Sequence, residues 1–127
     1  MRAALTLLIA LLILTGCEKR QSDAVENIKA FIGQGEPVML EVGADYCTAC
    51  KEMKLLIDVL KSEQPDLAIE MVNVSKSRES AQALGVRMIP TQIFFDAEGN
   101  EVFRHVGGYG EEAFRTVLKQ YNILKEK

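Results

Sequence analysis

The sequence is poor in several residue types that define other classes of protein. It has no Trp, one His, three Pro and three Cys among 127 residues. So few cysteines and prolines exclude a disulfide-dense mini-scaffold and a collagen-like chain. Positive charge is not in excess either, because 15 basic side chains face 18 acidic ones, and this argues against nucleic-acid binding. What remains, 48% hydrophobic and 26% charged residues, predicts one globular domain.

The chain also lacks an apolar run long enough to cross a bilayer. Its longest run, from Ala3 to Leu14, is broken by Thr6 and follows a single basic residue, Arg2. A transmembrane helix needs about 20 residues, whereas about 7 to 15 apolar residues behind a positive charge are typical of a secretory signal peptide. Residues 14 to 17 read Leu-Thr-Gly-Cys and resemble the lipobox of bacterial lipoproteins, in which the cysteine is lipidated and becomes the new N-terminus.

We therefore expect residues 1–16 to be a lipoprotein signal peptide and residues 17–22 to be a lipidated Cys17 with a short polar tether. The alternative is an ordinary signal peptide that happens to end near a cysteine. A lipid on Cys17 would hold the protein on the periplasmic side of the cell envelope. Glu18, where inner-membrane lipoproteins carry Asp, argues mildly against retention in the inner membrane, and the membrane stays unassigned. The folded domain would then span 23–127.

Local patterns predict alternating helices and strands over this domain. Four segments repeat apolar residues at helical spacing, and four are short apolar or β-branched runs. The predicted helices span 23–32, 47–61, 77–84 and 111–124, and the predicted strands span 38–42, 67–74, 91–95 and 101–106. The order αβαβαββα predicts an α/β fold with a four-stranded mixed sheet, mostly parallel, with helices on both faces and a closing antiparallel hairpin.

The motif that carries chemistry is Cys47-Thr48-Ala49-Cys50, at the predicted junction of a strand and a helix. Residues three apart lie on the same face of a helix, so the two sulfur atoms can reach bonding distance. The first sulfur also meets unpaired backbone amides and the positive end of the helix dipole, and both favour the thiolate. We therefore expect Cys47 to be a redox nucleophile and Cys50 to be the resolving thiol.

Other roles for the cysteine pair have less support. A zinc site needs about four N or S ligands, and once Cys17 is lipidated only the pair and His105 remain, so no metal site is predicted. Covalent haem attachment needs a histidine after the second cysteine, where the chain has Lys51. A structural disulfide suits an exported protein, but so short a loop stabilises little. Binding of Cu(I) by the two thiolates, as in a periplasmic metallochaperone, stays open as the alternative function.

Two further features could act with the dithiol. Glu41 lies in an otherwise apolar run, six positions before Cys47. If Glu41 is buried, its pKa rises and it can accept a proton from Cys50. If the strand is half exposed, Glu41 simply faces water, and the periodicity leaves both readings open. The second feature is Ile89-Pro90, directly before a predicted strand, where proline fits a strand start or a tight turn.

Three sequence blocks resemble the thioredoxin superfamily, and in particular the C-terminal thioredoxin-like domain of the bacterial reductant conveyor DsbD. They are VMLEVGADYCTACKEMK at 38–54, GVRMIPTQIFFDAEGNEV at 85–102 and VGGYGEEAF at 106–114. The resemblance implies a thioredoxin-like fold and a protein-disulfide reductase. We expect it to act as a monomer without a cofactor. It also implies disulfide-containing extracytoplasmic proteins as substrates and a membrane electron donor of the DsbD or CcdA type.

The resemblance also implies roles for single residues. It makes Cys47 the nucleophile, Cys50 the resolving cysteine and Glu41 a buried acid. It makes Pro90 a cis proline, whose neighbour Ile89 offers backbone groups to an extended substrate strand. Contacts with substrate are expected at Tyr46, Thr48, Ala49, Ile89, Pro90 and Gly107.

The chain departs from these relatives in several places. Tyr46 stands where Trp is usual, and Glu41 stands where Asp is usual. Met71 replaces a lysine that many thioredoxins carry near the buried acid. Lys54 replaces an active-site carboxylate of the DsbD-like domain, and it either folds back toward the dithiol or stays solvated. The strand that opens full thioredoxins is missing, which is why we expect four strands.

Overall fold

The computed structural model of the protein describes residues 24–126. The predicted signal peptide, Cys17 and the tether lie outside the described residues. Residues 24–31 are helical. The elements that follow are β1 (Val38–Gly43), α2 (Thr48–Glu63), β2 (Ile69–Asn73), α3 (Arg78–Ala83), β3 (Thr91–Phe95), β4 (Glu101–Val106) and α4 (Glu111–Gln120). This order confirms the predicted succession of helices and strands. No helix within 24–126 is long and apolar enough to cross a membrane.

The strands form one four-stranded sheet in the order β2-β1-β3-β4, which confirms the predicted mixed sheet. The expectation that the sheet is mostly parallel is wrong. Only β1 and β2 are parallel, whereas β1 with β3 and β3 with β4 are antiparallel. The reason is the length of α3, whose six residues extend only about 9 Å at about 1.5 Å per residue. This helix is too short to carry the chain back along the sheet, so β3 starts at the end where β2 stops.

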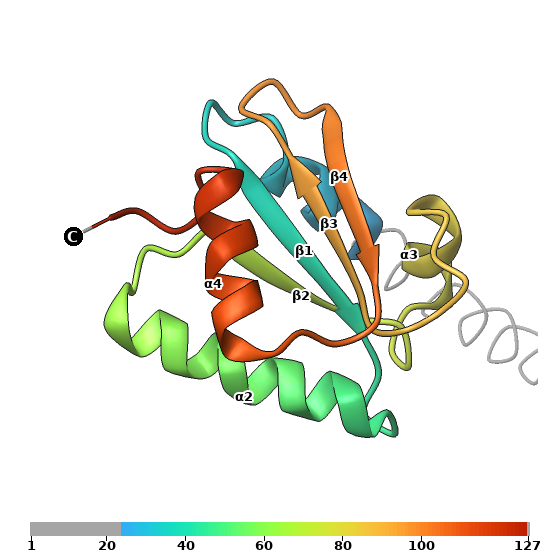
Figure 1. The fold of residues 1–127 in the computed structure, drawn as a ribbon. Helices are drawn as coiled ribbons and strands as arrows, with labels where there is room; N and C mark the ends of the chain where they lie inside the picture. Colours follow the sequence, from blue (N-terminus) through green and yellow to red (C-terminus); the bar gives the residue numbers. More distant parts are fainter. Residues whose placement is uncertain (1–23, 127) are drawn as a thin grey trace, which may run out of the picture.

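Helices cover both faces of the sheet (Figure 1). On one face, α2 and α4 pack on Met39 and Phe94 and enclose the larger apolar core. On the other face, the helix over 24–31 and the segment around α3 pack on Leu40 and Ile93. The two central strands β1 and β3 are therefore buried along their whole length. Because side chains alternate along a strand, Glu41 shares the α2 and α4 face with Met39.

The last helix is shorter than predicted. The apolar pattern continues to Leu124, but α4 ends at Gln120 because Asn122 takes a left-handed backbone conformation with φ of 58°. The N–H of Ile123 then donates to the carbonyl of Leu118 at 2.8 Å, a hydrogen bond typical of a helix C-terminus closed by a left-handed residue. Ile123 and Leu124 are still buried, so the pattern identified core residues but not a continuous helix.

Candidate active site

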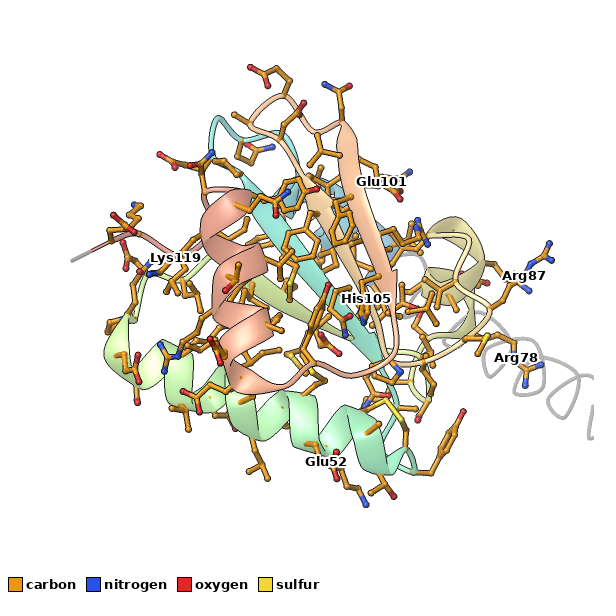
Figure 2. The ribbon with its side chains drawn as sticks, viewed as in Figure 1. Glu52, Arg78, Arg87, Glu101, His105 and Lys119 are labelled. Atoms are coloured by element: carbon orange, nitrogen blue, oxygen red, sulfur yellow. A yellow bond between two sulfur atoms is a disulfide. The ribbon has the colours of Figure 1, made fainter. Side chains whose placement is uncertain are left out.

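Cys47 and Cys50 form a disulfide at the start of α2, where Figure 2 shows the yellow sulfur atoms. Cys47 is the N-cap of α2, and its Sγ accepts a hydrogen bond of 3.2 Å from the N–H of Cys50. The first turn of α2 has no acidic residue, so nothing there offsets the positive end of the helix dipole. After reduction, the same N–H group and dipole favour a thiolate at Cys47. Cys47 is half-buried, whereas Cys50 is only 6% exposed.

Hydrogen bonds hold the loop before the disulfide against the end of β2. The Asn73 side-chain amide donates to the Asp45 carboxylate at 2.8 Å, and the Asp45 N–H donates to Ser75 Oγ at 3.3 Å. The N–H of Cys47 donates to the carbonyl of Ala44 at 3.2 Å. Sequence reasoning missed Asp45, Asn73 and Ser75, because their contacts join segments about thirty positions apart.

Gly43 ends β1 directly behind the disulfide. A Cβ at this position would lie 3.0 Å from Cys50 Cβ and 3.1 Å from Cys50 Sγ. Both distances are shorter than ordinary van der Waals contact. Gly43 is therefore needed for the strand to approach Cys50 so closely, a role that the sequence reasoning did not assign to it.

Glu41 is buried on the face of the sheet that carries the dithiol, so the reading in which it faces water is wrong. It is 1% exposed, and burial raises its pKa from 4.5 to about 8, against the smaller lowering effect of a hydrogen bond from Gln92. That bond joins Gln92 Nε2 to Glu41 Oε1 at 3.2 Å. Met71 lies opposite Glu41 in the sheet. Lys54 pairs with Asp58 at 2.6 Å on the exposed surface of α2.

A cavity of about 400 Å³ connects the acid to the dithiol. Both Glu41 and Cys50 line it, together with Met71 and the lysines Lys51, Lys54 and Lys76. A space of this size holds several water molecules. The arrangement can therefore move a proton between the Cys50 thiol and the Glu41 carboxylate through water.

The peptide bond between Ile89 and Pro90 is cis, which confirms the expectation drawn from the resemblance. Register pairs Thr91 with Val42, so Pro90 lies at the same end of the sheet as Gly43 and the disulfide. The N–H of Gly107 donates to the carbonyl of Pro90 at 2.8 Å, and Gly107 has a φ of 110° that favours glycine.

The other predicted substrate-contacting residues differ in exposure. Tyr46 is 76% exposed, Thr48 is exposed, and Ala49 and Ile89 are half-buried. Met88, which the sequence reasoning did not single out, adds an exposed apolar side chain beside Ile89. Contact with substrate by these residues stays a prediction.

A redox-active cysteine pair at a helix N-terminus, beside a cis proline at the same end of a mixed sheet, defines a thiol-disulfide exchange protein of thioredoxin fold. The sequence agrees, because residues 25–122 match the family of thioredoxin-like domains. The chain belongs to this family and is a thioredoxin-like thiol-disulfide oxidoreductase whose active site is the Cys47–Cys50 pair.

Individual relatives give the same assignment. The chain is 30% identical to a thioredoxin of Chlamydia pneumoniae over 96 residues, which are 76% of this chain and 92% of the relative. It is 33% identical over 110 residues to the thiol:disulfide interchange protein DsbD of Ralstonia nicotianae, covering 80% of this chain but only 18% of DsbD. The crystal structure of Fasciola hepatica thioredoxin has the same fold, with a TM-score of 0.65 and 24% identity over 79% of this chain and 92% of that one.

Within residues 24–126, no three or more His, Cys, Asp or Glu side chains gather into a possible metal site. Cu(I) held by two thiolates needs only Cys47 and Cys50. Copper binding by the pair therefore stays a prediction.

Proposed function

We propose that this protein is a lipid-anchored, extracytoplasmic reductase of protein disulfides. The observation that carries the exchange chemistry of this proposal is the cavity that Cys50 shares with a buried Glu41, whose pKa is raised by burial to about 8. A resolving cysteine must lose a proton before it can attack, and a nearby base with a pKa near that of a thiol suits this step. The predicted lipid on Cys17 would place the site outside the cytoplasmic membrane.

The reaction has two exchange steps. The Cys47 thiolate attacks a substrate disulfide, a mixed disulfide forms, and the first substrate sulfur leaves as a thiolate that takes a proton from water. Glu41 then accepts the Cys50 proton, and the Cys50 thiolate attacks Cys47 Sγ. The Cys47–Cys50 disulfide closes, and the second substrate thiolate leaves and is protonated. Two electrons pass from the dithiol to the substrate disulfide.

The surface around the pair supports a protein substrate. Exposed apolar side chains at Tyr46 and Met88 belong to the segments that carry the disulfide and Pro90. Ile89 would offer its backbone to an extended chain, as the resemblance implies. A donor of the DsbD or CcdA type in the membrane would return two electrons to the oxidised pair after each turnover.

Insulin reduction tests the proposed activity. The full chain, extracted in detergent and supplied with dithiothreitol, should accelerate the reduction of insulin, and Cys47→Ser should abolish this acceleration. A reduction potential near −120 mV, at the strongly oxidising end of the range for such proteins, would overturn the reductase direction. Tight Cu(I) binding without insulin reduction would favour the metallochaperone instead.

Trapping identifies the substrate. Cys50→Ser leaves the mixed disulfide on Cys47 unresolved, so the variant should accumulate covalent adducts in cells that disappear on reduction. Cys47→Ser is the matched control and should capture nothing. Absence of adducts with Cys50→Ser would contradict an exchange role in the cell.

Mass spectrometry of the mature protein tests the anchor. A diacylated or triacylated Cys17 at the N-terminus is expected, and Cys17→Ser should release the protein from the membrane fraction. An unmodified N-terminus elsewhere in the chain would overturn the lipoprotein assignment while leaving the exchange activity untouched.

A further inference from the structure

A row of polar side chains crosses the sheet behind the dithiol. Glu41 on β1 pairs in register with Gln92 on β3, and Gln92 pairs with His105 on β4. All three side chains share the face that α2 and α4 cover, because each lies two positions from a residue of the larger core on its own strand. His105, labelled in Figure 2, is half-buried on β4.

This row contains buried polar atoms that the hydrogen bonds described so far leave without partners. Gln92 is completely buried and donates its amide to Glu41 Oε1. Its own carbonyl oxygen, Oε1, and the Nε2 atom of His105 are both buried with no hydrogen-bond partner within the described residues. Tyr109 stacks on the imidazole with ring centroids 4.0 Å apart, so the ring is held against the sheet. An acceptor and a possible donor therefore lie on neighbouring residues of paired strands, and buried groups of this kind are rarely left unpaired.

We propose that His105 donates its Nε2–H to Gln92 Oε1, directly or through one water molecule, and thereby keeps the Gln92 amide directed at Glu41. The inference rests on the proposed function, because it assigns Gln92 and His105 as positioning residues for the base of the resolving step. A glutamine side chain can turn its amide around and exchange the places of its oxygen and nitrogen. The Nε2–H of His105, on the side of Gln92 away from Glu41, needs an acceptor. It therefore selects the orientation in which the Gln92 oxygen faces His105 and the nitrogen faces Glu41.

The orientation of Gln92 matters for the proton affinity of Glu41. An amide N–H directed at the carboxylate favours the charged form, whereas an amide oxygen there favours the protonated form. A hydrogen bond to a charged group corresponds to a change of about one pKa unit or more. The other titratable or charged groups that line the cavity with Glu41 are Cys50, Lys51 and Lys54 of α2, Asp45 after β1 and Lys76 after β2. Tyr109 covers His105. These cavity groups and Tyr109 are unchanged in the variants below.

The test is a measurement of the Glu41 pKa by NMR of its side-chain carboxyl carbon in the full, oxidised chain. Gln92→Leu and His105→Leu should each raise this pKa by about one unit, a tenfold change in proton affinity. His105→Gln retains a donor and should restore a value close to that of the unchanged protein. Val102→Ala, on the exposed side of β4, is the matched control and should have no effect. At pH 7 the resolving step should slow up to tenfold in both leucine variants and recover at higher pH.

Two results would overturn the inference. One is a Glu41 pKa that His105→Leu leaves unchanged while Gln92→Leu raises it. The other result comes from the unchanged protein. If the chemical shifts of the His105 ring nitrogens place the proton of the neutral ring on Nδ1, Nε2 has no proton to donate. Failure of the proposed function is distinguishable, because it appears as lack of insulin reduction by the unchanged protein, whatever the Glu41 pKa does in the variants.

Discussion

Replacing Glu41 by glutamine should make the protein more stable, by an amount that increases with pH. Glutamine keeps the size of the side chain and can bond to Gln92, but it never carries a charge. Burial of Glu41 raises its folded-state pKa to about 8, whereas the unfolded chain has the ordinary value of 4.5. The folded protein therefore keeps a proton on Glu41 over a pH range in which the unfolded chain has lost it, and raising the pH in this range favours unfolding.

The magnitude follows from the two pKa values. Below pH 4.5 Glu41 is protonated in both states, and its ionisation does not lower the free energy of unfolding. From 4.5 to about 8 the free energy of unfolding falls by about 1.4 kcal/mol for each pH unit, about 5 kcal/mol in all. Above this range both states are ionised and the cost stays constant. At pH 7 the cost is about 3 kcal/mol, a large share of the stability of a small domain.

Urea unfolding of the oxidised protein, followed by circular dichroism at one-unit steps from about pH 4 to pH 9, measures this effect. The difference in unfolding free energy between Glu41→Gln and the unchanged protein should grow through this range and level off at its upper end. Glu70→Gln, an exposed glutamate on β2, controls for the loss of a carboxylate from the sheet. A difference for Glu41→Gln that is the same at every pH would refute the reasoning.

Three other substitutions test the geometry. Gly43→Ala places a Cβ against Cys50 and should destabilise the fold by about 1 to 3 kcal/mol in urea unfolding; Gly108→Ala, with nothing within 4 Å of its added Cβ, should not show this packing cost. Asn122→Ala should cost about 1 kcal/mol because alanine disfavours the left-handed conformation that ends α4, whereas Asn122→Gly should not lower the melting temperature. Asn73→Ala removes the hydrogen bond to Asp45 and should speed amide hydrogen exchange in residues 44–47. Unchanged exchange would show that the loop does not depend on this hydrogen bond.

The antiparallel hairpin of β3 and β4 shows what local sequence can predict. The bounds of β3 and β4 agree with those predicted, because the turn between them is determined by its own residues. The Asp96 carboxylate accepts hydrogen bonds from the backbone N–H groups of Glu98 and Asn100 at 3.1 and 2.8 Å. The end of α4 was not predictable in this way, since Ile123 and Leu124 continue the apolar pattern although the chain has already left the helix.

The candidate site also contains one part that local sequence predicts and another that depends on contacts between distant segments. The cysteine pair follows from spacing within one helical turn, so sequence alone identified it. The burial of Glu41 depends on whether α2 covers its side of the sheet, and alternation along β1 does not contain that information. The row from Glu41 through Gln92 to His105 depends on the register between strands far apart in the chain. No local pattern singles out Gln92 or His105, and both were missed as partners of the acid.

Burial of Glu41 links the stability of the fold to the proposed chemistry of the dithiol. A carboxylate of ordinary pKa would have to take a proton from a thiol of pKa about 8.5, a transfer uphill by about 5 kcal/mol. A pKa of about 8 for Glu41 removes nearly all of this free-energy difference. The desolvation that makes Glu41 a matched base is the same desolvation that destabilises the fold at neutral pH, so the two effects cannot be separated by a substitution at this position. Glu41→Gln should therefore gain stability and lose speed in the resolving step together.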